Sequence, residues 1–266
     1  VTARPARLPR ISPASEWHLG RGSVMMPGAL VPASARLTCT IVAPGVNGWT
    51  EALDRREATS LRQARQLMAQ AGHAAGFKVT LDCPNNRYAY DQQICQALVP
   101  MWARIGIRVK INSLPFASLV PKLETLDSSL WMLGWGSPDF DALQNLLSLA
   151  YTRSDKVDGT YNAARISDPK LDRLIDQARY ENNPIKRTGL LQQALEIVKT
   201  QSYYLPLAHA MRAWVMQRSI SLVVPPSERP EMRFVIVTGR RAGVSDTAPA
   251  APDKAGRNQP ASARNR

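Results

Sequence analysis

The chain has 266 residues, with 34 Lys plus Arg against 21 Asp plus Glu and a formal net charge of +13. Hydrophobic residues make up 44% of it, which excludes a wholly disordered chain because such chains lack the apolar surface to offset the entropy cost of folding. Three cysteines exclude a disulfide-dense miniprotein and a zinc site of cysteine alone. No apolar run is long enough to predict a transmembrane helix.

Most of the excess positive charge lies at the two ends. Residues 1–36 contain five Arg and one acidic residue, and residues 240–266 contain six basic and two acidic residues. Both ends are rich in Pro, Ser, Gly and Ala, and their apolar residues follow neither a helical nor a strand period for more than a few residues. They predict a poorly ordered segment 1–40 and a disordered basic tail 239–266 around a folded region 41–238. The start of the chain has no continuous apolar core, so no signal peptide is visible.

The first half of the folded region predicts a helix, a strand, a second helix and a second strand. Apolar residues follow a helical period over 59–71, alternate over 77–81, follow a helical period again over 94–105, and alternate once more over 107–111. A strand, a helix and a strand in so short a length form a βαβ unit, so we expect a parallel pair joined by a right-handed crossover. The loop after the first of these strands opens at the carboxyl edge of the sheet, where open α/β sheets place ligands.

The second half predicts a buried strand over 130–135 and a helix over 141–151. Two further helices begin at Pro169 and Pro184, each directly after a residue that can cap a helix. Short strands are expected to close the folded region, over residues 204–208, 213–216, 220–224 and 234–237.

Motifs for catalysis are missing from the sequence. It contains no phosphate-binding loop, no G-x-G-x-x-G, no H-E-x-x-H, no G-x-S-x-G and no C-x-x-C. Three scattered histidines leave little material for a metal site. We therefore expect no enzymatic activity, no metal and no cofactor.

A family resemblance emerges from segments that follow one another in a fixed order. Residues 76–111, GFKVTLDCPNNRYAYDQQICQALVPMWARIGIRVKI, resemble the C-terminal half of the dipeptide/oligopeptide/nickel-binding group of ABC-transporter solute-binding proteins, which is extracellular solute-binding protein family 5. Five more segments agree with that family in order, and the resemblance covers about residues 41–237 in all. These segments are residues 42–54, 61–76, 133–141, 167–177 and 204–209.

The resemblance implies an α/β, periplasmic-binding-protein-like lobe of type II, with a mixed sheet and flanking helices. It implies a substrate-binding component that binds a peptide or peptide-like solute and delivers it to ABC permease subunits without catalysis. A periplasmic location and a monomeric state follow from it. Since the N-terminal lobe of the family has no counterpart here, we expect mainly one lobe of a two-lobed receptor.

A basic nucleic-acid-associated protein is the alternative. It rests on the net charge of +13, but residues 37–239 carry only five of those charges, so we expect no specific nucleic-acid partner.

The first candidate ligand-binding residues are Trp135, Asp139 and Asp141. In peptide-binding relatives an aspartate shortly after this tryptophan pairs with the α-ammonium of the ligand, and a carboxylate suits that task. The usual position, three after the tryptophan, is Pro138 here. Asp139 can instead be a turn residue and Asp141 a helix cap.

Asn85, Asn86 and Arg87 follow the strand over 77–81 and form the second candidate group. Side-chain amides and a guanidinium there can hold a ligand carboxylate or peptide carbonyls. The alternative is that Pro84, Asn85 and Asn86 only form a turn.

Cys83 and Cys95 lie 12 residues apart, one after a strand and one in the following helix. In an oxidising compartment they can form a disulfide, and the alternative is a pair of buried thiols. Cys39 stays outside this pair.

Overall fold

The computed structural model describes residues 36–56, 58–154, 157–210, 220–222 and 232–237. Residues 1–35, the predicted strand 213–216 and the tail 239–266 lie outside the described residues. None of the helices within the described ranges is long and apolar enough to span a bilayer.

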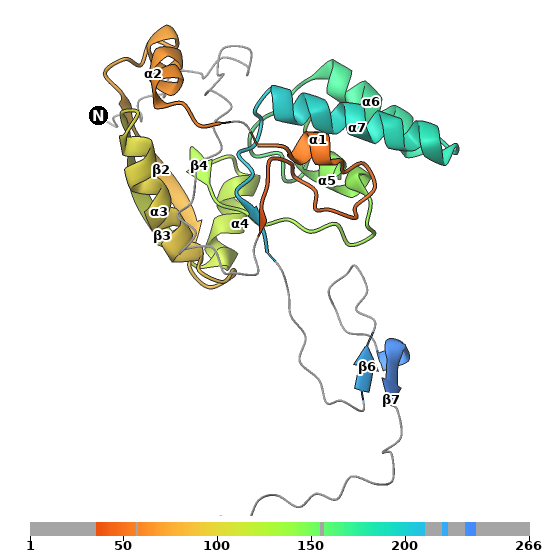
Figure 1. The fold of residues 1–266 in the computed structure, drawn as a ribbon. Coiled ribbons are helices and arrows are strands. Elements are labelled where there is room, and N and C mark those ends of the chain that lie inside the picture. Colours follow the sequence, from red (N-terminus) through yellow and green to blue (C-terminus); the bar gives the residue numbers. More distant parts are fainter. Residues whose placement is uncertain (1–35, 57, 155–156, 211–219, 223–231, 238–266) are drawn as a thin grey trace, which may run out of the picture.

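A parallel sheet forms the first half of the described fold. Its strands are β2 (Phe77–Pro84), β3 (Ile107–Leu114) and β4 (Leu130–Trp131), in the order β3-β2-β4, and both pairings are parallel. Helix α3 (Asp91–Ala103) connects β2 to β3 and lies against them (Figure 1). The βαβ unit predicted from the sequence is thus confirmed.

Two glycines let β2 and β3 start side by side. Gly76 and Gly106 both have a positive φ, of 74° and 90°, which strains any residue with a Cβ. A Cβ on Gly76 would lie 2.0 Å from the carbonyl oxygen of Gly106. The amide of Phe77 donates to that same oxygen at 3.2 Å, so the close approach of the two glycines aligns the strands from their first residues.

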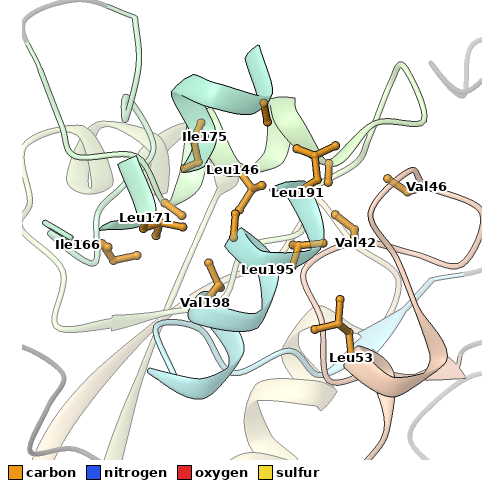
Figure 2. Close-up of a cluster of buried hydrophobic side chains, with 14 residues drawn as sticks. Val42, Val46, Leu53, Leu146, Ile166, Leu171, Ile175, Leu191, Leu195 and Val198 are labelled. Atoms are coloured by element: carbon orange, nitrogen blue, oxygen red, sulfur yellow. The ribbon is translucent and has the colours of Figure 1, made fainter. Parts of the chain in front are cut away.

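Helices dominate the second half. They are α5 (Ala142–Leu149), α6 (Pro169–Tyr180) and α7 (Pro184–Thr200), with the short α1 (Glu51–Asp54) packed against α7. Asp168 and Asn183 cap α6 and α7 by accepting hydrogen bonds from backbone amides, as the sequence predicts. The apolar faces of these helices enclose the largest core cluster (Figure 2), which includes Val42, Val46, Leu53, Leu146, Ile166, Leu171, Ile175, Leu191, Leu195 and Val198.

Helices α2 (Leu61–Gln70) and α4 (Phe116–Glu124) complete the sheet half. We predict no element from the sequence over residues 112–129, where α4 forms with Pro121 inside it, although proline normally interrupts a helix. Leu119 and Leu123 are nevertheless fully buried, and this burial favours the helix against the proline.

The observed strands are shorter than the sequence predicts in the second half. The strand expected over 130–135 ends at Trp131, and of the segment 204–208 only Ala208 pairs, in β5 (Ala208–His209). Strands β6 (Ile220–Leu222) and β7 (Val235–Val237) pair antiparallel, and a short 3₁₀ turn, η1 (Met232–Phe234), directly precedes β7. The α/β class is confirmed, and among the described strands the antiparallel pairs lie outside the parallel sheet.

The described fold includes residues before the expected boundary at residue 41. Strand β1 (Arg36–Leu37) pairs antiparallel with β5. The hydroxyl of Thr38, which is buried, donates to the buried carboxylate of Asp54 at 2.6 Å, and the amide of Cys39 donates to the same carboxylate at 2.8 Å. Residues 36–40 therefore belong to the folded unit.

Candidate functional site

The loop after β2 is held by a buried carboxylate at the start of α3. Asp91 is only 5% exposed, and its Oδ2 accepts hydrogen bonds from the amides of Arg87 and Tyr88 at 3.1 and 3.2 Å. Its Oδ1 accepts from the amide of Gln92. Because one carboxylate satisfies three backbone amides, the backbone of residues 87–88 is fixed relative to α3.

The side chains of Asn85 and Asn86 each form a hydrogen bond within the protein. The Nδ2 of Asn85 donates to the hydroxyl of Ser113 at 3.2 Å, and the Oδ1 of Asn86 accepts from the amide of Phe116 at 2.9 Å. Both contacts tie the loop after β2 to the end of β3 and the start of α4. These contacts reach residues 28 and 30 positions later in the chain, so they are tertiary contacts and not the local turn that the sequence offered as the alternative, and Asn86 stays exposed.

Arg87 is exposed at the same edge of the sheet, and its guanidinium lies on aromatic rings. Its carbon Cζ is 5.2 Å from the centroid of the Phe116 ring and 5.8 Å from that of Tyr88. Within the described ranges, no carboxylate forms an ion pair with it. Stacking of this kind orients a guanidinium and leaves its N–H groups directed elsewhere.

The loop after β4 contains Trp135, which is half-buried. Its ring lies against that of Tyr161, with centroids 4.8 Å apart and planes tilted by 59°. The preceding residue, Gly134, is bound to the phenol of Tyr88 through both its amide and its carbonyl. The loops after β2 and β4 therefore meet, as expected for the carboxyl edge of a parallel sheet.

Asp141 is engaged by the protein itself. Its carboxylate forms an ion pair with Arg187 through two hydrogen bonds, of 2.5 and 3.0 Å, and also accepts from the Nδ2 of Asn47 at 2.9 Å. Its Oδ1 caps α5 by accepting from the amide of Leu143. Burial alone would raise the pKa of Asp141, but the hydrogen bonds from Arg187, Asn47 and Leu143 outweigh it and lower the pKa. The cap that the sequence offered as the alternative is what the geometry shows.

Asp139 is exposed and stabilises the turn before α5. Its Oδ1 accepts from the amide of Asp141 at 3.2 Å. Phe140, between them, has a φ of 56° and a side chain that is 52% exposed. Its carbonyl accepts from the amide of Asn47 at 2.8 Å, which holds this turn against the segment before α1. Asp139 is the more accessible of the two candidate carboxylates.

A buried polar network around Asp82 connects the strands and loops at the carboxyl edge of the sheet. Asp82, in β2, is 2% exposed and accepts hydrogen bonds from the Nδ2 of Asn112 at 2.5 Å and from the hydroxyl of Ser128 at 2.6 Å. The Nζ of Lys122 lies 3.5 Å from the Oδ2 of Asp82 and forms an ion pair with it. Desolvation alone would lower the pKa of Lys122, but Asp82 and Asp127 outweigh it and raise the pKa. The network joins β2 to β3, to α4 and to the segment before β4.

Cys83 and Cys95 form a disulfide, and both residues are fully buried. The bridge links the end of β2 to α3 on either side of the loop that carries Asn85, Asn86 and Arg87. Tyr88, Phe116 and Asp91, which shape that loop, were not singled out from the sequence. Tyr88 and Phe116 meet only through a tertiary contact, which no spacing marks, whereas the contacts of Asp91 to residues 87, 88 and 92 are local. Groups of His, Cys, Asp and Glu able to hold a metal ion do not occur in the part of the chain that the structure describes.

Known proteins that resemble this chain are solute-binding proteins. The family model for bacterial extracellular solute-binding proteins, family 5, middle part, matches residues 30–156. Di/tripeptide-binding protein 1 of Pseudomonas aeruginosa is 29% identical over 161 residues, which are 59% of this chain and 29% of that protein. Oligopeptide-binding protein OppA of Bacillus subtilis is 23% identical over 237 residues, which are 84% of this chain and 41% of that protein.

Solved structures share the fold. HbpA2 of Haemophilus parasuis matches with a TM-score of 0.71 and 20% identity over 85% of this chain and 44% of that one. The periplasmic binding protein DppA of Helicobacter pylori, solved with a peptide, matches with a TM-score of 0.68 and 18% identity over 86% of this chain and 44% of that one. The chain spans less than half the length of each of these four relatives. The family-model match over residues 30–156 and the similarity to curated peptide-binding proteins support a solute-binding protein of bacterial extracellular family 5, whose members are non-enzymatic.

Proposed function

We propose that this chain is mainly one lobe, residues 41–238, of the substrate-binding component of an ABC transporter that imports peptides or peptide-like solutes. The segments 1–40 and 239–266 flank that lobe in the proposal, although residues 36–40 pack with it. The protein binds its solute, presents it to the permease subunits and makes or breaks no covalent bond. It works as a monomer in the periplasm, and the disulfide suits that oxidising compartment.

The observation that supports this proposal most directly is the arrangement of Arg87. An exposed cation stands at the carboxyl edge of a parallel sheet, stacked on Phe116 and Tyr88, with the loop of Trp135 beside it. A guanidinium held in this way can donate two parallel hydrogen bonds to a carboxylate, such as the C-terminus of a short peptide. Relatives that are named as di/tripeptide-binding and oligopeptide-binding proteins agree with a solute of this class.

The α-ammonium group of such a solute needs a carboxylate other than that of Asp141. The carboxylate of Asp141 already satisfies Arg187, Asn47 and the amide of Leu143. Asp139 remains as the carboxylate for an ammonium group, since it is exposed and its hydrogen bond from the amide of Asp141 uses one oxygen only. We therefore assign solute contacts to Arg87, Trp135 and Asp139, and a supporting role to Asn85, Asn86 and Asp141.

Titration of the isotope-labelled full chain with dipeptides and tripeptides, followed by amide NMR shifts, tests the proposal. We expect shifts confined to residues 85–88, 116 and 134–139, with an affinity in about the millimolar range because one lobe covers little of a ligand. Arg87→Ala should weaken binding at least about tenfold, the cost of a charge-assisted hydrogen bond, whereas Arg108→Ala, at an exposed position of β3, should not. Peptides at tens of millimolar that move none of these amides would refute the proposal.

A further inference from the structure

Three loops at the carboxyl edge of the sheet converge on one side chain, Tyr88. Its amide is fixed by Asp91 at 3.2 Å, which places it at the start of α3. Its ring meets that of Phe116 edge-on, with centroids 6.2 Å apart, and Phe116 begins α4 directly after β3. Its hydroxyl accepts from the amide of Gly134 at 2.9 Å and donates to the carbonyl of the same residue at 3.2 Å, in the loop after β4.

The contact with Gly134 is also tight in space. A Cβ at position 134 would lie 2.7 Å from Cε1 and 3.0 Å from Cζ of the Tyr88 ring. The ring therefore rests directly on the backbone of the third loop, and glycine is needed there for the close approach and not for an unusual φ. Gly136, two residues on, has open space around the same hypothetical atom.

Arg87 depends on the same ring. Its guanidinium lies over Tyr88 and Phe116, so a displacement of the Tyr88 ring removes part of the surface on which the cation rests. Trp135 depends on it from the other side, because it follows Gly134, whose amide and carbonyl are both held by the phenol.

We infer that Tyr88 is a positioning residue that couples the loop of Arg87 to the loop of Trp135, so that a displacement of one loop is transmitted to the other. The inference rests on the proposed function only in regarding Arg87 and Trp135 as solute contacts. The coupling itself is a property of the unliganded protein. A solute that engages Arg87 then also selects the position of Trp135.

The first test removes the hydroxyl. In Tyr88→Phe the ring stays and the amide of Gly134 loses its acceptor, so hydrogen exchange at that amide should become about three- to tenfold faster, the range set by one net hydrogen bond. The indole N–H resonance of Trp135 should move as well. Tyr90→Phe is the matched control, because Tyr90 lies in the same loop with its side chain 54% exposed, and it should change neither signal.

The second test perturbs the other end of the contact. Gly134→Ala should displace the Tyr88 ring and shift the side-chain Nε–H resonance of Arg87, whereas Gly136→Ala should leave that resonance in place. Unchanged exchange at Gly134 in Tyr88→Phe, or an unmoved Arg87 resonance in Gly134→Ala, would overturn the inference. Both measurements are made without solute, so a failure of peptide binding would refute the proposed function and leave this result standing. Where the wild type binds, Tyr88→Phe should weaken binding by about three- to tenfold.

Discussion

Replacement of Asp141 by Asn distinguishes a structural carboxylate from a solute anchor. The asparagine keeps an oxygen that can cap α5 but loses the negative charge that faces Arg187. The two side chains are 16% and 23% exposed, so the pair is largely shielded from water. Breaking a buried pair costs about 3–5 kcal/mol, and the partial exposure here places Asp141→Asn at about 2–3 kcal/mol of lost stability.

The role of Asp141 also predicts how the stability of the protein depends on pH. Because the pKa of Asp141 is lowered in the folded state, the stability that its charge contributes is complete above its ordinary pKa of 3.8 and is lost as the pH falls through the folded value. The difference in unfolding free energy between wild type and Asp141→Asn should therefore be largest near neutral pH and shrink below about pH 4. Urea unfolding monitored by tryptophan fluorescence at several pH values measures it.

Asp139→Asn is the matched control, since Asp139 is an exposed carboxylate two residues away with one contact to its own turn. It should change stability by no more than about 0.5 kcal/mol. The structural role of Asp141 would be refuted if Asp141→Asn unfolded at the wild-type urea concentration while its peptide affinity fell tenfold or more. That result would return Asp141 to the ligand-binding residues.

Two further predictions concern the strands and the disulfide that support the site. Gly76→Ala should lower the free energy of unfolding by about 3 kcal/mol or more in urea, because the added Cβ meets the carbonyl of Gly106. The control Gly72→Ala has a similar positive φ of 77° but open space, so it should cost only about 1–2 kcal/mol, and equal losses would contradict the close-approach argument. Replacing both Cys83 and Cys95 by Ser should cost about 3 kcal/mol in the chain-entropy model, and a wild-type stability that dithiothreitol leaves unchanged would contradict it.

Local patterns in the sequence were sufficient for the secondary structure of the central unit. Alternation over residues 77–81 and 107–111, with a helical period between them, specified two strands and a crossover helix, because each period decides which face is buried. Caps at Asp168 and Asn183 were readable for the same reason, since a cap acts on amides two and three residues away. Helix α4 was not predicted, and the burial of Leu119 and Leu123 favours a helix there despite Pro121.

The roles of the site residues were decided by partners far away in the chain. Asp141 is bound by Arg187, 46 residues later, and Tyr88 by Gly134, 46 residues later. Asn86 is satisfied by Phe116, 30 residues later. The types and order of the residues determined the family resemblance, the α/β class and the edge of the sheet at which candidate residues gather. Which of those side chains stay available to a solute depends on hydrogen bonds and ring contacts between loops, and these exist only once the strands have brought the loops together.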